Sequence, residues 1–234
     1  MSLDDRFDIG QPIHIGQIAT AYPAVEKEYD RQVLIKVIHP QWTGDSELVE
    51  RFSREGQAME RIDHPNVVRI IEYGSEDDAP YLVLEWVDGG TLAEKIASGP
   101  IHQDMIKQIA GELLAGLKAV HTEGLLHRDI KPDNILLDTH GHAKLADFSL
   151  VGFEQMSGLT GHGVIVGSPA YMAPELLDGK PATQRSDLYG IGLVLLEALT
   201  GSNPFMSSDP LVSLDLVRRA NPPNLTGRSQ IDPE

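Results

Sequence analysis

The chain has 234 residues, of which 41% are hydrophobic and 23% are charged, as expected for a globular protein with a sizeable core. Its net charge of -16 disfavours nucleic acid and anionic membranes as main partners, because their phosphate groups would be repelled. The absence of cysteine excludes disulfides and every metal site or nucleophile built on a thiolate.

The N-terminal ten residues are acidic, whereas a secretory signal would begin basic and continue apolar. No run approaches the roughly 20 apolar residues that a membrane helix requires. We therefore expect no membrane segment in this chain. The lack of cysteine also suits a reducing compartment, so a cytoplasmic location is predicted.

The first part of the chain is rich in β-forming residues. Two such segments, residues 9–18 and 32–38, are separated by the polar stretch 26–31, a pattern typical of antiparallel hairpins. Asp45 or Ser46 then begins a predicted helix, which the sequence His64-Pro65-Asn66 ends. Its apolar positions, at roughly helical spacing, are Val49, Phe52, Met59 and Ile62.

Strand patterns return at residues 67–71 and 81–87, with a polar turn predicted across 74–80. Glycines 89 and 90 then break the sheet, and helical patterns follow at residues 92–97 and 105–123. The longer of these helices has one apolar face, formed by Ile106, Ile109, Leu113, Leu117 and Val120.

This order of elements predicts an α+β fold with two lobes. The small N-terminal lobe, residues 1–87, is expected to hold an antiparallel sheet and one helix. The large lobe, residues 88–234, is expected to be mainly helical, with short strands and loops between residues 125 and 147. No internal repeat or low-complexity run interrupts either part.

The most informative segment is His127-Arg128-Asp129-Ile130-Lys131-Pro132-Asp133-Asn134, which lies between two short apolar stretches. Burying so many charged and amide groups would be costly without partners. A loop at the end of a strand can instead aim Asp129 and Asn134 at one ligand. The segment resembles the catalytic loop of protein kinases, H-R-D-L-x-x-x-N, with isoleucine in place of leucine.

Further motifs resemble the same family in the same order. Asp147-Phe148-Ser149 is similar to D-F-G, and Ala173-Pro174-Glu175 matches A-P-E. Upstream, Val33-Leu34-Ile35-Lys36 resembles V-A-I-K, and Glu55 lies on the predicted helix that follows. The resemblance extends over residues 7–205 and implies a two-lobed protein-kinase fold, similar to the eukaryotic-like serine/threonine kinases of bacteria.

The resemblance implies a Mg²⁺- and ATP-dependent transfer of phosphate to serine or threonine hydroxyls of a protein substrate. Lys36, oriented by Glu55, would hold the α- and β-phosphates. Asp129 would orient the acceptor hydroxyl and take its proton, while Lys131 would reach the transferring phosphate. This lysine is typical of serine/threonine kinases rather than tyrosine kinases.

The metal ligands implied by the resemblance are Asn134 and Asp147, whose oxygens suit Mg²⁺. An apolar roof over the adenine is expected from Ala21 and Leu34, where the family usually has valine and alanine, and Leu136 would form the floor. The residues implied to line the nucleotide site are Ile13, Gly16, Ala21, Leu34, Lys36, Leu84, Glu85, Val87 and Leu136.

The substrate-facing segment before Ala173 keeps a hydroxyl at Ser168, where the family usually has threonine. The resemblance also implies that a phosphorylated residue between Ser149 and Ala173 pairs with arginine. Ser157, Thr160 and Ser168 are the candidates, and Thr160 is our first choice. His140 and His142 flank a glycine and are interpreted as a turn rather than a metal site.

The chain departs from the family pattern in three places. The phosphate-covering loop keeps only Gly16 of its three glycines, with His14 and Ala19 in the other positions. Ser149 replaces the glycine of D-F-G. Beyond residue 205 the family continues through further helices, so the large-lobe surface is expected to favour self-association or a partner that covers it.

Two other functions stay open at this point. The first is a pseudokinase, in which these departures have abolished turnover and the fold serves as a nucleotide-binding or scaffold module. The second is a small-molecule phosphotransferase, which would share the general fold and some catalytic carboxylates. The lysine-proline pair at residues 131–132 and the A-P-E match favour a protein kinase over this last alternative.

Overall fold

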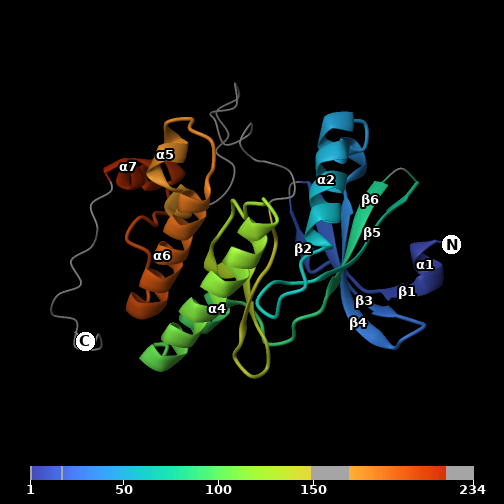
Figure 1. The fold of residues 1–234 in the computed structure, drawn as a ribbon, viewed down its shortest axis with the longest axis horizontal. Coiled ribbons are helices and arrows are strands. Elements are labelled where there is room, and N and C mark those ends of the chain that lie inside the picture. The colour runs from blue at the N-terminus through green and yellow to red at the C-terminus, as the bar shows by residue number, and fades with distance from the viewer. Residues whose placement is uncertain (1, 17, 78, 149–168, 220–234) are drawn as a thin grey trace. The chain divides into compact units, whose positions relative to one another are not determined.

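The computed structural model describes residues 2–16, 18–77, 79–148 and 169–219, although the side chains of residues 51 and 55 lie outside this description. The chain forms two compact units, Met1–Asp88 and Gly89–Glu234. Each unit is described by itself below, with its elements labelled as in Figure 1. Among the described residues, no helix combines the length and apolar character needed to cross a membrane.

The first unit is built around an antiparallel sheet with strand order β1-β3-β4-β6-β5, in which β2 pairs with β3 (Figure 1). Two helices and a short 3-10 turn accompany it. The elements are α1 (Leu3–Arg6), β1 (Phe7–Ile9), β2 (His14–Ile15), β3 (Ala19–Glu26), β4 (Arg31–Ile38), η1 (Pro40–Trp42), α2 (Ser46–Met59), β5 (Ile70–Glu76) and β6 (Ala79–Glu85).

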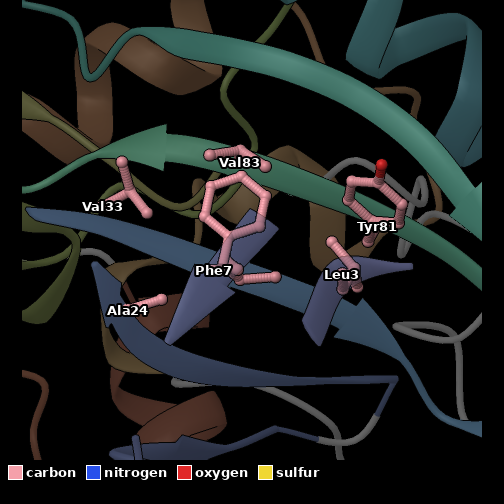
Figure 2. Packing of buried hydrophobic residues seen from close by; sticks show 7 residues of the cluster. Leu3, Phe7, Ala24, Val33, Tyr81 and Val83 are labelled. Carbon is pink, nitrogen blue, oxygen red and sulfur yellow. The ribbon is translucent and has the colours of Figure 1, made fainter. Parts of the chain in front are cut away.

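One face of this sheet is covered by the N-terminal segment. Leu3 of α1 and Phe7 of β1 lie among buried residues of the central strands, as Figure 2 shows. The cluster consists of Leu3, Phe7, Ala24, Val33, Ile35, Tyr81 and Val83. Since side chains alternate along a strand, Lys36 belongs to the other face of β4.

Helix α2 covers that other face. Asp45 caps its start by accepting a hydrogen bond from the Leu48 backbone N–H, which confirms the predicted beginning. Leu48, Phe52 and Met59 are buried at helical spacing. The predicted apolar position Ile62 is also buried, but it lies beyond the end of the helix.

Two strand predictions were wrong in their bounds. The strand expected at residues 67–71 begins only at Ile70 and continues to Glu76, through part of the expected turn. The actual hairpin turn includes Asp77, whose φ of 48° is tolerated because aspartate enters the left-handed region more readily than most residues. Similarly, the strand expected at residues 81–87 is β6, which spans Ala79–Glu85. Within the β-rich segment 9–18, Ile9 ends β1 and His14–Ile15 form β2, and both strands pair antiparallel with β3.

In its described residues, the second unit is mainly helical, with one two-stranded hairpin. Helix α4 contacts both α6 and β8, while α3 contacts β7. The elements are α3 (Leu92–Ala97), α4 (Gln103–Thr122), η2 (Pro132–Asn134), β7 (Ile135–Leu137), β8 (Ala143–Leu145), η4 (Pro169–Tyr171), α5 (Pro174–Leu177), α6 (Gln184–Thr200) and α7 (Pro210–Arg219).

Local signals account for the helices of this unit. In α4 the predicted apolar positions are all buried, from Ile106 to Val120. A capping box between Thr183 and Ser186 begins α6, and Gly201, with φ of 75°, ends it. The predicted α+β fold, with an antiparallel sheet in one part and helices in the other, is confirmed.

Candidate active site

The polar segment after α4 is held by a carboxylate that is distant in sequence. Asp187 lies in the first turn of α6 and is only 3% exposed. Its two oxygens accept backbone hydrogen bonds from His127 N (3.0 Å) and Arg128 N (2.9 Å). The His121 side chain, from α4, lies 2.8 Å from the same carboxylate. Three bonds to one buried acid therefore fix the start of the loop.

The backbone of this loop is strained at the point where Asp187 holds it. Arg128 has a φ of 68°, a conformation that residues other than glycine rarely adopt. Such strain costs about 1–3 kcal/mol and persists only where the surroundings over-determine it. The bonds from Asp187 to the two neighbouring amides supply that restraint, and the conformation sets the direction in which the chain continues to Asp129.

His127 is completely buried, and its ring lies against Phe148, with 4.4 Å between ring centroids. Within the described part of the chain, its Nε2 has no hydrogen-bond partner. Burial lowers the pKa of His127, because the charged imidazolium would lose its hydration. This histidine is therefore a neutral part of the core beneath the loop.

Asp129, Lys131 and Asn134 form one hydrogen-bonded group. Lys131 Nζ donates to Asp129 Oδ2 at 2.8 Å, and Asn134 Nδ2 donates to the same oxygen at 2.8 Å. Asn134 Nδ2 also donates to the Asp129 backbone oxygen. Two polar side chains thus orient the carboxylate, which remains partly exposed to solvent.

The hydrogen bonds of Asn134 also determine the orientation of its own amide. Because both of its partners are acceptor oxygens, the nitrogen end must face Asp129, which leaves Oδ1 for another ligand. The Asn134 backbone oxygen accepts from Ala146 N at 2.9 Å, next to the exposed residue Asp147. The structure therefore brings the Asn134 loop and the segment that carries Asp147 together.

The chemistry of these two residues fits the predicted metal. An amide oxygen and a carboxylate are hard oxygen donors, as Mg²⁺ prefers, and Mg²⁺ usually needs only one or two protein carboxylates. Asp147 has a φ of 55°, so its backbone also adopts an uncommon conformation. Arg128 and Asp147 thus both have left-handed backbone conformations, and both lie close to the group formed by Asp129, Lys131 and Asn134.

In the first unit, four of the predicted nucleotide residues share one sheet face. Lys36 of β4 lies between Ala21 of β3 and Leu82 of β6 in the strand register. Leu34, two residues earlier, is paired with Leu84. Because directly opposite residues point to the same side of a sheet, Ala21, Leu34, Leu84 and Lys36 lie on one face.

The predicted partner of Lys36 belongs to the helix on this face. Glu55 lies in α2, immediately before Gly56. A Cβ atom on Gly56 would come within 3.2 Å of the Leu82 side chain, so this turn of the helix rests on the strand next to Lys36. The backbone of Glu55 is thereby placed over the face of the sheet to which Lys36 belongs.

In the predicted phosphate-covering loop, backbone hydrogen bonds hold Gly16 and Ile13 to β3 despite the missing glycines. Gly16 N donates to Ala19 O at 3.0 Å, and Ile13 N donates to Ala21 O. The His14 ring lies beside Gly16, within 3.6 Å of the position a Cβ would occupy. Ile13 and Ile15 are strongly exposed, at 59% and 71%. Exposed isoleucines and a histidine thus surround the single glycine of this loop.

The other predicted nucleotide residues are Glu85 and Val87 of the first unit and Leu136 of the second. Glu85 ends β6, and its carboxylate accepts a hydrogen bond from Arg69 N at 2.9 Å. Val87 follows two residues later, near the end of the first unit. Leu136 belongs to β7 of the second unit, where it is bridged to Thr91. Ser149, Ser157, Thr160 and Ser168 lie outside the described residues.

Two features of this region were missed in the sequence. One is the set of bonds from Asp187 to His121 and to the loop; the sequence marks Asp187 only as a residue that matches the kinase pattern at the start of a helix. The other is a hydrogen bond from Tyr171 OH to Glu197 Oε2 at 2.6 Å. Burial raises the pKa of Glu197, and the bond ties η4 to α6.

The histidines interpreted as a turn do form one. Asp138 Oδ1 accepts hydrogen bonds from the backbone N–H groups of His140 and His142, and Gly141 has a φ of 86°. These residues join β7 to β8. In the part of the chain that the structure describes, no group of three or more histidine and carboxylate side chains is arranged to hold a metal ion.

The comparisons with known proteins agree with this geometry. The protein kinase domain family matches residues 7–223. The chain is 39% identical over 204 residues to the serine/threonine-protein kinase PrkC of Bacillus subtilis, covering 87% of this chain and 32% of PrkC. Over 210 residues it is 37% identical to the serine/threonine-protein kinase PknL of Mycobacterium tuberculosis, covering 89% of this chain and 53% of PknL.

A third relative is the probable serine/threonine-protein kinase PknB of Lactococcus lactis, which is 36% identical over 214 residues. That match covers 91% of this chain and 34% of PknB. The chain therefore spans only about a third to a half of the length of these relatives. Since the family match includes nearly the whole chain, the protein belongs to the protein kinase domain family.

Proposed function

We propose that this chain is a Mg²⁺- and ATP-dependent serine/threonine protein kinase. The observation that carries the proposal is the group formed by Asp129, Lys131 and Asn134 on a loop anchored by Asp187. Protein kinases use ATP and a divalent metal ion, and the relatives described above are named as serine/threonine-protein kinases. The specific ion and the substrate class are part of the proposal.

Asp129 is proposed to act on the acceptor hydroxyl. Phosphoryl transfer depends mostly on placing the two reacting groups in line and on neutralising charge. The carboxylate of Asp129 is oriented by two donors and partly exposed, so it can bind a serine or threonine hydroxyl and accept its proton. Lys131, bonded to the same carboxylate, is proposed to offset the charge of the transferring phosphate.

Asn134 and Asp147 are proposed to hold the metal ion. Oδ1 of Asn134 is left available by the two hydrogen bonds of Nδ2, and Asp147 contributes a carboxylate. When bound, Mg²⁺ neutralises phosphate charge. The backbone bond between Ala146 and Asn134 keeps the two ligand segments in register.

In the first unit, Lys36 is proposed to bind the α- and β-phosphates, oriented by Glu55 of α2. The adenine is proposed to lie against the apolar residues on the Lys36 face of the sheet. The proposed nucleotide residues are Ile13, Gly16, Ala21, Leu34, Lys36, Leu84, Glu85, Val87 and Leu136. The position of Ala21, Leu34 and Leu84 on the same face as Lys36 supports this assignment.

Transfer of labelled phosphate from ATP with Mg²⁺, to the protein itself and to a generic protein acceptor, tests the proposal. We expect label on serine or threonine in the wild type and its loss in Asp129→Asn, by at least about 10²-fold, because the base is removed. Asp133→Asn is the matched control, since it changes an exposed carboxylate of the same loop. Mapping the labelled residues also tests Thr160 as the phosphorylated site.

The outcomes separate the two candidate functions. Label that persists in Asp129→Asn would contradict the role of Asp129. Folded wild-type protein that binds ATP but transfers no phosphate under any of these conditions would instead establish a nucleotide-binding pseudokinase.

A further inference from the structure

Gly56 of α2 allows an unusually close approach between this helix and the sheet. A Cβ atom at this position would lie 3.2 Å from Leu82 Cδ2 and 3.3 Å from Tyr73 Cδ2, tighter than nine in ten real contacts of this kind. Glycine inside a helix is about 1 kcal/mol less favourable than alanine. Its presence in α2 is therefore explained by the distance to the sheet rather than by helix propensity.

The surface beneath Gly56 belongs to the strands next to Lys36. Leu82 of β6 is completely buried and lies directly opposite Lys36 of β4 on one side and Tyr73 of β5 on the other. The helix thus contacts the immediate cross-strand neighbour of the lysine. A change in the separation of α2 from Leu82 changes the distance from the Glu55 backbone to the Lys36 strand by a similar amount.

A second contact fixes the same turn of the helix. Ser53 Oγ and Tyr73 Oη are hydrogen-bonded, and Ser53 Oγ also donates to Val49 O at 2.7 Å. The Phe52 ring packs on Tyr73, with centroids 6.4 Å apart. Glu55 lies between Ser53, which is bonded to β5, and Gly56, which lies against β5 and β6, so its helical turn is held on both sides.

We propose that Ser53, Gly56 and Tyr73 are positioning residues for phosphoryl transfer. They set how close α2 approaches the Lys36 strand, and so whether Glu55 can orient Lys36. This inference rests on the proposed function, in which Lys36 and Glu55 act as a pair. Ser53, Gly56 and Tyr73 are not proposed to touch the nucleotide or the acceptor, and they act by positioning the Lys36–Glu55 pair.

The first test is steady-state kinetics of two variants, with ATP varied. Gly56→Ala adds a methyl group where the neighbours must shift by a few tenths of an ångström, and Tyr73→Phe removes the hydroxyl bonded to Ser53. We expect kcat to fall about three- to tenfold in each, because small displacements of catalytic groups reduce rates sharply. KM for ATP should change by less than about twofold, because the adenine residues are not moved.

The matched control is Tyr81→Phe. This variant also removes one phenolic hydroxyl of the same sheet, but it is bonded to Glu72 and belongs to the opposite face. We expect its thermal stability to fall about as much as that of Tyr73→Phe, with kcat unchanged. A similar loss of kcat in Tyr81→Phe would mean that general destabilisation explains the result, and would overturn the proposal.

A double-mutant cycle separates an action through Glu55 from an additive structural effect. In a Glu55→Gln background, Gly56→Ala should lower kcat by less than about twofold further, because the pair that it disturbs is already lost. Equal effects in both backgrounds, or normal kcat in both single variants, would overturn the inference. Absence of any transfer by the wild type would instead overturn the proposed function, so the two failures are distinguishable.

Discussion

Asp187 is the residue on which the geometry of the loop depends most. One buried carboxylate accepts hydrogen bonds from two successive backbone amides and lies within bonding distance of His121. It therefore offsets the strain of the positive φ at Arg128. Because Asp129 is the next residue, the position of the proposed base depends on an acid that is not itself proposed to touch substrate.

The substitution Asp187→Asn tests this dependence. The asparagine amide has only one acceptor oxygen, whereas both oxygens of Asp187 accept from backbone N–H groups. In the variant, the amide nitrogen would therefore face one of these N–H donors and could not accept its hydrogen bond. We expect the free energy of unfolding to fall by about 2–4 kcal/mol and kcat to fall with it. Chemical denaturation and phosphate transfer measure these changes. Asp209→Asn, at an exposed aspartate just before α7, is the control and should change neither.

At the scale of elements, α4 is joined to the β7–β8 hairpin through Glu112. Its two oxygens accept from the Ala143 backbone N–H and bond His142 Nδ1 at 2.7 Å. The carboxylate of Glu112 raises the pKa of His142, mainly through this hydrogen bond. The contact holds the hairpin whose strands run from Asn134 toward Asp147.

Glu112→Gln should lower the pKa of His142 toward its ordinary value, since the amide keeps an oxygen for Ala143 but loses its charge. NMR titration of the His142 ring measures this change. A raised folded pKa contributes stability that is fully present below the unfolded value of about 6.5 and is lost as pH rises through the folded pKa. The difference in Tm between the wild type and the variant should therefore be larger below about pH 6.5 than above the folded pKa of His142. An unchanged His142 titration in the variant would contradict the assignment.

At the scale of the whole molecule, the net charge of -16 is the dominant property. A protein of this charge attracts basic acceptors over distances comparable to the Debye length and repels acidic ones. Acceptor choice should thus depend partly on charge outside the site, in addition to contacts near Asp129.

Salt provides the test of this effect. Between about 0.05 M and 0.5 M NaCl, kcat/KM for a basic protein acceptor should fall several-fold, because screening shortens the range of attraction. For a neutral peptide acceptor, kcat/KM should stay nearly constant over the same range of salt. Parallel losses for both acceptors would point to an effect of salt on the enzyme itself.

Local sequence signals predicted much of the fold. The start of α2 at Asp45 and the apolar face of α4 follow from capping and periodicity, which act over a few residues, and both predictions were confirmed. The start of β5 was predicted three residues too early, because an apolar run does not show where its partner strand is available. The order of motifs was enough to predict the kinase family.

The sequence by itself determined the family, the α+β class and the types of residue available for chemistry, because these depend on composition, local periodicity and motif order. The tertiary structure decided which distant groups meet. Asp187 bonds a residue 60 positions away, and Gly56 of α2 rests on Leu82, the cross-strand neighbour of Lys36. A local signal can mark one member of such a contact, as the position of Asp187 at the start of α6 does, but it does not identify the partner, because long-range packing depends on the path of the whole chain.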